Sequence, residues 1–218
     1  MNGKRIFREP INGFTHLFGA LVSLVGLILL IAKVLSSPYG NNLQLTAAIT
    51  FGVSLIFLYT ASSVYHLVNS TEKIIAFLRR LDHSMIFILI AGTYTPVCLI
   101  ALSGHLRWII LISVWTMAIS GVLFKMIWFN LPRWVSTAFY IFMGWFVIFF
   151  IKPIAYSISS LGILWLILGG VFYTIGAIIY AAKPRKLKFK HFGFHEIFHI
   201  FILLGSFSHY ICIFRYVL

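Results

Sequence analysis

Residues Leu161 to Ala182 read LGILWLILGGVFYTIGAIIYAA and contain no charged side chain. A helix needs about 20 consecutive, mostly apolar residues to cross the hydrocarbon core of a bilayer, so this stretch predicts a transmembrane helix. Six further stretches of similar character are joined to it by short connections. The seven predicted spans cover residues 14–35, 45–67, 84–102, 108–128, 135–151, 161–182 and 194–217. We therefore predict an all-α membrane protein, a seven-transmembrane helix bundle that forms one domain over residues 1–218.

The composition of the chain excludes an ordinary soluble domain. Hydrophobic residues make up 61% of it, charged residues 10%, and the mean hydropathy is +1.01. Soluble chains are roughly 45–50% apolar and about 25% charged. The first apolar stretch follows Lys4, Arg5 and Arg8. It is too long for the core of a signal peptide and has no small-residue cleavage site after it, so we interpret it as the first helix.

The net charge of +13 is distributed unevenly across the predicted spans. With seven spans, successive connections alternate between the two sides of the membrane. Only four of the 17 lysines and arginines fall on the second side, namely Lys33, Arg107, Lys152 and Arg215. The positive-inside rule therefore predicts a cytoplasmic N-terminus and a C-terminus outside. The basic connections, which include residues 183–190, should attract anionic headgroups, and this distribution argues against a nucleic-acid partner.

Side chains suited to a metal site lie at the ends of three predicted spans. Ser62 and His66 are four residues apart, so they share one face at the end of the second span. Asp82 begins the third span, and His195 and His199 share a face at the start of the seventh. The predicted topology places all five on the same side of the membrane. Ionisable residues at membrane depth are costly and mark functional sites by default, and the chain has only four acidic residues.

Zinc is the metal that suits these side chains. Catalytic zinc sites use three protein ligands plus a water, and two histidines at i and i+4 of one helix can bind one ion together. His66, His195 and His199 are therefore the predicted ligands. Asp82 is then available to hold or deprotonate the water, and Ser62 to hydrogen-bond the water or a developing oxyanion. Iron and manganese are open alternatives, and a histidine in a helical bundle is often only a hydrogen-bonded packing residue.

Other polar residues near these ends have structural interpretations as well. Residues 9–16, EPINGFTH, can cap the first helix or line the entrance of the site. Glu196 points off the ligand face and can orient its helix, face the basic connections or take part in catalysis. His209 lies about 15 Å from His199 along the helix, at 1.5 Å per residue. It is too distant to bind the same ion, so we expect a polar contact near the other membrane surface.

Five motifs give the sequence a family resemblance. They are EPINGFTH at 9–16, ASSVYH at 61–66, RLDHS at 80–84, AGTYTP at 91–96 and FHEIFH at 194–199. In combination they resemble the haemolysin III family of bacterial membrane proteins, within a superfamily that includes adiponectin and progestin receptors and alkaline ceramidases. The resemblance implies a seven-helix bundle in the bacterial inner membrane, with an intramembrane zinc site near the cytoplasmic side. It also implies zinc ligands at His66, His195 and His199, with Asp82 on the zinc water and Ser62 beside it.

Two classes of function compete on these grounds. The superfamily implies a zinc-dependent hydrolase that cleaves an amide or ester of a membrane lipid, with ceramide-like amides as examples. The family name implies a haemolysin-like, cytolytic or pore-forming protein, or a receptor-like one, in which zinc fixes the inner ends of three helices. Three ligands disfavour such a structural site, because structural sites normally have four. A third interpretation, transport of a proton or a metal, lacks a chain of polar groups through the outer half of the membrane. Neither the substrate nor the oligomeric state follows from the sequence.

Overall fold

The computed structural model describes residues 6–127, 132–184 and 193–218. Within these ranges it contains seven helical spans that are long and apolar enough to cross a membrane, which confirms the predicted seven-helix bundle. Lys4, Arg5 and the basic residues at 185–190 lie outside the described residues. The elements are α1 (Pro10–Ser36), α2 (Asn42–Leu67), α3 (Glu72–Pro96), η1 (Val97–Ala101), α4 (Gly104–Ile127), α5 (Arg133–Trp145), η2 (Phe146–Phe150), α6 (Ile151–Ser157), α7 (Ser160–Ala182), α8 (Phe194–Cys212) and η3 (Ile213–Val217).

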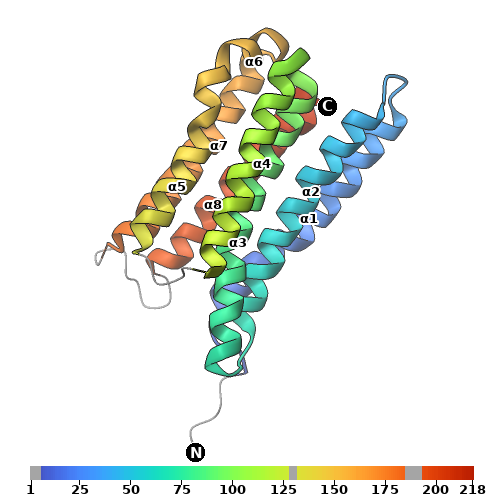
Figure 1. The fold of residues 1–218 in the computed structure, drawn as a ribbon. Helices are drawn as coiled ribbons and strands as arrows, with labels where there is room; N and C mark the ends of the chain where they lie inside the picture. The colour runs from blue at the N-terminus through green and yellow to red at the C-terminus, as the bar shows by residue number, and fades with distance from the viewer. Residues whose placement is uncertain (1–5, 128–131, 185–192) are drawn as a thin grey trace, which may run out of the picture.

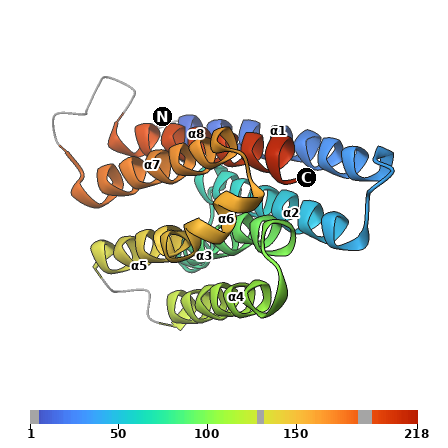
Figure 2. The ribbon, with the colours of Figure 1, turned by 90° about the horizontal axis from the view of Figure 1, so that it is seen from above.

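The bundle is arranged around α3, whose span is the most deeply buried of the seven. Helices α1 and α2 pack along each other, and so do α7 and α8 (Figure 1). Seen from above, α1 and α8 lie at one edge of the bundle and α4 at the opposite edge, with α3 between them (Figure 2). The start of α1 and the end of α8 lie at opposite ends of the bundle, as an odd number of spans requires.

The outer faces of the helices are apolar. On α1, the side chains of Phe18, Leu21, Val25 and Ile28 are each more than half exposed. A continuous apolar exterior of this kind would promote aggregation in water, whereas it matches the hydrocarbon core of a bilayer. Several polar side chains within the described spans are buried instead, among them those of His16, His66 and His199, and their positions define the candidate site.

The third span begins earlier than the sequence predicted. Helix α3 starts at Glu72 rather than at residue 84, shortly after α2 ends. Its first turns carry Arg79 and Arg80. A hydropathy criterion assigns such a charged stretch to a connection between spans, although charged residues form helices readily. Asp82 therefore lies inside α3, more than two turns beyond its start, and does not begin the helix.

The fifth span, predicted at residues 135–151, is interrupted by the 3-10 segment η2. The hydroxyl of Tyr94 on α3 occupies this interruption. It accepts a hydrogen bond from the backbone N–H of Val147 at 2.6 Å, and it donates to the carbonyl oxygens of Met143 and Gly144, each at 3.0 Å. Backbone groups at membrane depth must be satisfied within the protein. The side chain of Tyr94 thus replaces helical hydrogen bonds that the interruption removes.

We expect Tyr94→Phe to lower the free energy of unfolding by about 1–3 kcal/mol, the cost of leaving buried backbone groups without a partner. The thermal midpoint of the purified protein in a mild detergent measures the effect. Tyr156→Phe is the matched control, because Tyr156 is 91% exposed on α6. Equal midpoints for the two variants would contradict the assignment of Tyr94 to this break.

Candidate metal centre

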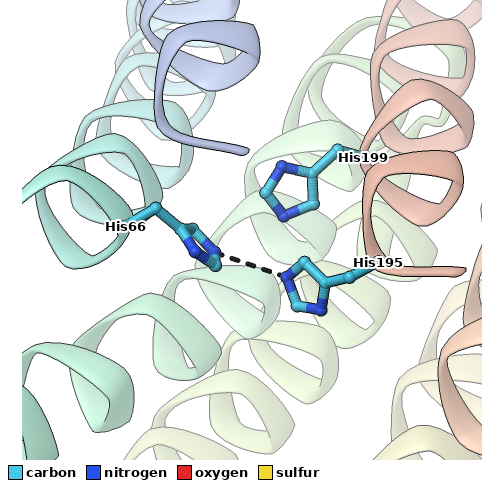
Figure 3. A group of neighbouring side chains, drawn as sticks. All are labelled: His66, His195 and His199. Atoms are coloured by element: carbon cyan, nitrogen blue, oxygen red, sulfur yellow. Dashed lines mark hydrogen bonds between the residues drawn. The ribbon is translucent and has the colours of Figure 1, made fainter. Parts of the chain in front are cut away.

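Three histidine side chains converge at one end of the bundle. His66 lies in the last turn of α2, and His195 and His199 lie in the first two turns of α8 (Figure 3). One ring nitrogen from each lies within 4.8 Å of the others, so the group can hold a metal ion. The Nε2 atoms of His66 and His195 are 3.4 Å apart. His66 and His199 are buried and His195 is partly exposed, which places the centre inside the bundle.

The local sequence explains why the α8 histidines face inward. Glu196 accepts a hydrogen bond from the backbone N–H of Gly193 at 2.7 Å, which satisfies a group that the helix start leaves unpaired. This contact fixes the point at which α8 begins. His195 and His199, four residues apart, then share the face that is directed at α2. The sequence left several roles open for Glu196. This hydrogen bond supports the one in which Glu196 orients its helix.

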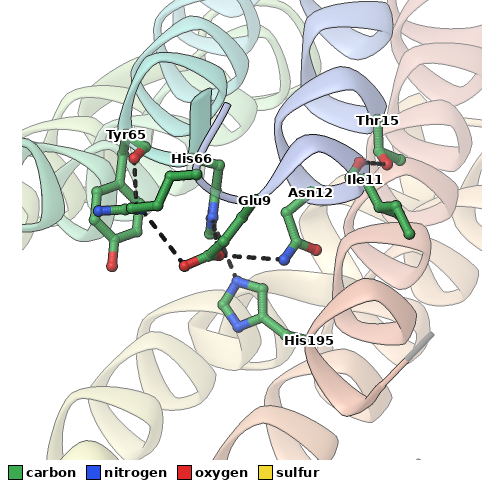
Figure 4. A network of polar contacts seen from close by, with 8 residues as sticks. Glu9, Ile11, Asn12, Thr15, Tyr65, His66 and His195 are labelled. Carbon is green, nitrogen blue, oxygen red and sulfur yellow. Dashed lines mark hydrogen bonds and ion pairs between the residues drawn. The ribbon is translucent and has the colours of Figure 1, made fainter. Parts of the chain in front are cut away.

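Glu9, at the start of α1, determines which nitrogen of His66 faces the centre. Its Oε2 atom lies 2.7 Å from His66 Nδ1 (Figure 4). A carboxylate only accepts hydrogen bonds, so Nδ1 carries a proton, and in the neutral ring Nε2 then presents its lone pair toward His195. The hydrogen bond with His66 lowers the pKa of Glu9 to about 2 in spite of its partial burial. Histidines that bind metals commonly donate their second nitrogen to a carboxylate in this way.

The segment that carries Glu9 is tied to the end of α2. The backbone N–H of Glu9 donates to the carbonyl oxygen of His66 at 2.9 Å, and the Arg8 guanidinium donates to that of Tyr65 at 2.5 Å. Arg8 also forms an ion pair with Glu9 at 3.6 Å, and Asn12 donates to the Glu9 carboxylate at 3.4 Å. From the sequence we expected residues 9–16 either to cap the first helix or to line the entrance of the site. Glu9 does occupy the N-cap position, but its side chain caps no helical N–H and binds His66 instead.

His16, two turns beyond Glu9 on the same face of α1, also belongs to the centre. Its ring stacks on that of His199, with centroids 3.6 Å apart and an angle of 13° between the planes. Both ring nitrogens of His16 and Nδ1 of His199 are buried and have no hydrogen-bond partner among the described residues. Buried polar atoms are nearly always paired, so this concentration of unpaired nitrogens fits a centre that a ligand completes. The signal in the sequence that could have identified His16 is the spacing of Glu9, Asn12 and His16 along one helix face.

Asp82 and Ser62 lie beside the histidines. Neither contributes one of the three ligand atoms that lie within 4.8 Å of one another. Ser62 is buried one turn before His66 on α2. Asp82 lies on α3, with the Ser62 hydroxyl and the His66 ring among the groups that interact with its carboxylate. Both residues line the same cavity as His195 and His199. The structure thus places all five predicted site residues in one region.

The cavity has a volume of about 330 Å³, within the range of small-molecule sites. It extends from the histidines along the inner face of α5 as far as Ile151 on α6, and most of its wall is apolar. His209, which we expected to make a distant polar contact, lines this cavity and stacks on Tyr173 with centroids 5.4 Å apart. A long apolar pocket with a polar end suits an amphiphilic molecule.

The fold and the histidine group define a class of protein: a membrane bundle of seven helices with a buried group that can hold a metal ion. The family described as Haemolysin-III related matches residues 4–210, so the chain belongs to that family. It is 40% identical to Hemolysin-3 of Bacillus cereus, over 96% of this chain and 92% of that protein. It is 37% identical to the Hemolysin-3 homolog of Bacillus subtilis (strain 168), over 97% and 95% of the two chains.

A more distant relative supports the wider superfamily. The chain is 29% identical to the Adiponectin receptor protein of Drosophila melanogaster, over 94% of this chain and 50% of the receptor. These relatives confirm the family resemblance that the five motifs suggested. Together with the seven apolar spans, they establish a multi-pass bacterial membrane protein.

We expect the purified protein to contain about one metal ion per chain, because three imidazole ligands suffice for a tight site. His66→Ala and His199→Ala should each lose that ion. Elemental mass spectrometry of protein that was never exposed to a chelator measures the content. His105→Ala is the control, because His105 is exposed at the start of α4. Folded protein without metal would contradict the assignment of this centre.

Glu9→Gln should weaken metal binding by roughly 10–100-fold, the usual effect of altering a carboxylate that orients a histidine ligand. Glutamine keeps the shape and a hydrogen-bond acceptor but removes the charge. Competition against a chromophoric chelator gives the dissociation constant. Glu72→Gln, at an exposed position where α3 begins, controls for the loss of one acidic group. The same dissociation constant in both variants would show that Glu9 has no role in orienting His66.

Proposed function

We propose that the protein is a zinc-dependent hydrolase that cleaves an amide or ester bond of a membrane lipid. One observation carries this proposal: three histidines that can hold a metal ion face a mostly apolar cavity that also contains a carboxylate and a hydroxyl. Three imidazoles leave a coordination position of a zinc ion open, which is typical of catalytic sites. When bound, zinc would polarise a substrate carbonyl and make a water molecule more acidic.

Asp82 would be the general base and then the general acid. Its carboxylate accepts a proton as a water oxygen forms a bond with the carbonyl carbon. The bond from that carbon to the amide nitrogen or ester oxygen then breaks, and Asp82 returns the proton to the leaving group. The products are a carboxylic acid and an amine or alcohol. Asp82 suits this role because it lies beside the histidines without being grouped with them as a ligand.

Ser62 would stabilise the charge that develops on the carbonyl oxygen. Its hydroxyl is held on α2 one turn before His66, so it keeps a fixed position relative to the histidines. A fixed donor in a buried site is worth more than the same donor in water, because no reorganisation is needed when charge develops. The apolar remainder of the cavity would hold an acyl chain, with the basic end of the bundle facing the cytoplasm and anionic headgroups.

The names of the two Bacillus relatives favour a second candidate function, cytolysis. In that case the metal would join α2 to α8 and the protein would perturb a membrane without catalysing a reaction. The mostly apolar cavity wall argues against a water-filled pore. Dye release from liposomes separates the two functions, because release that persists in His199→Ala does not depend on the metal centre.

Asp82→Asn should reduce lipid hydrolysis by about 10²–10⁴-fold, the usual contribution of a general acid–base residue. The variant should keep its metal, since Asp82 is not in the ligand group. Release of fatty acid from a panel of lipid amides and esters measures turnover, with metal content determined on the same samples.

Glu72→Gln again serves as the matched control for loss of an acidic side chain. Wild-type turnover by Asp82→Asn on every lipid that the unaltered protein hydrolyses would remove Asp82 from the mechanism. Absence of turnover by the metal-loaded wild-type protein on every lipid of the panel would favour the cytolytic alternative.

A further inference from the structure

A second polar cluster lies in the wall of the same cavity, and the hydrolytic mechanism does not use it. It consists of Lys125 from the last turn of α4 together with Arg133, Ser136 and Thr137 from the first turns of α5. Lys125 is only 5% exposed, and its Nζ donates to the Ser136 hydroxyl at 2.7 Å. Ionisable residues buried in a membrane bundle are costly and mark functional positions by default. The cluster therefore requires an explanation.

The simplest structural explanation is that Lys125 stabilises the end of α4, since cations are favourable near a helix C-terminus. The contact of its ammonium group with α5 indicates a further role. The Lys125 ammonium reaches across to Ser136 on α5, and the side chain faces the cavity. Arg80, which is not part of the cavity wall, donates from Nη1 to the carbonyl oxygen of Met126 at 3.3 Å and thus caps this helix end itself.

The charges around Lys125 favour an anion. Arg133 lines the same cavity as Lys125, and both Arg133 and Arg79 lie close enough to Lys125 for like-charge repulsion, so positive charge gathers at this end of the bundle. Like charges in a poorly solvated region repel, and an anion between them converts the repulsion into attraction. The Arg133 guanidinium is held at this end by the face of the Tyr180 ring, with Cζ 5.1 Å from the ring centroid.

Tyr180 also connects this cluster with the metal centre. Its ring lies 5.8 Å from the ring of His195, and its hydroxyl lies 3.2 Å from Nε2 of His83. The cationic cluster and the histidines are therefore separated by one aromatic side chain. Most of the remaining wall of the cavity is apolar, with Ile90 and Ile148 among its residues. A molecule in this cavity can contact the cations, the histidines and the apolar region together.

We propose that the cavity binds a lipid amphiphile with an anionic headgroup, a phosphate or a carboxylate, which Lys125 and Arg133 hold. The position of its scissile carbonyl at the histidines rests on the proposed hydrolase function, whereas the anion subsite does not require turnover. Guanidinium and ammonium groups bind such anions through charge-assisted hydrogen bonds. The continuity of the cluster with the apolar wall favours an anion attached to an acyl chain over a free one.

Calorimetric titration of the metal-loaded protein in a neutral detergent tests the proposal. The probes are lysophosphatidic acid, a monoacylglycerol of the same chain length, and inorganic phosphate. We expect lysophosphatidic acid to bind about tenfold or more tightly than the monoacylglycerol. One hydrogen bond to a charged group is enough to produce a difference in affinity of this size. Lys125→Met should remove that difference, and Lys125→Arg, which keeps the charge, should retain most of it. Lys73→Met, at an exposed position in the first turn of α3, is the matched control and should leave the difference unchanged.

The possible outcomes test the proposed anion subsite separately from the proposed lipid hydrolysis. Equal binding of the anionic and neutral probes by the wild-type protein, or an unchanged preference in Lys125→Met, would overturn the proposal. Inorganic phosphate that binds as tightly as lysophosphatidic acid would overturn the lipid part of it. Should Lys125→Met fail to fold, Arg133→Gln provides the second test of the preference. A Lys125-dependent preference without hydrolysis of any lipid would support the subsite and count against the hydrolase.

Discussion

The hydrogen bond between His66 Nδ1 and the Glu9 carboxylate is the contact on which the geometry of the centre depends. It fixes the proton on one ring nitrogen and directs the other at His195 and His199. The same segment binds the end of α2 through its backbone, since the N–H of Glu9 donates to the carbonyl oxygen of His66. The start of α1 is therefore built into the centre, although it contributes none of the three grouped histidine ligands.

The membrane makes such pairings necessary throughout the bundle. Without water in the hydrocarbon core, each inward polar group needs a partner within the protein. Tyr94 satisfies the interruption of the fifth span, and Tyr59 and Tyr173 both bind the Ser206 hydroxyl, at 2.6 and 2.8 Å. Against this background the unpaired nitrogens of His16 stand out. The Ser84 hydroxyl and Nδ1 of His209 also have no hydrogen-bond partner among the described residues. At the metal centre, however, three such nitrogens belong to two stacked rings, which is the arrangement that a bound ligand would explain.

The features that the sequence predicted correctly are those that depend on one helix at a time. Apolar length identifies the spans, and the spacing of His195 and His199 places both on one face. The early start of α3 was missed because its first turns are charged, and hydropathy does not distinguish a polar helix from a connection. The partners of Glu9 and Lys125 were missed for a different reason. Each contact joins two helices, and the spacing along one helix contains no information about its neighbour.

The depth of the centre connects the fold with the proposed chemistry. His66 lies in the last turn of its span and His195 in the first turn of another, so the centre is near one end of the bundle and not at its middle. The ester or amide bonds of a lipid lie at the corresponding depth, between the headgroup region and the hydrocarbon core, which is about 30 Å thick. In the proposed mode of binding, a lipid would present its carbonyl without leaving its natural depth, and its chain would follow the apolar wall toward Ile151. The cations close to the same end would then meet the headgroup, because headgroup, carbonyl and chain follow one another in this order from the membrane surface inward.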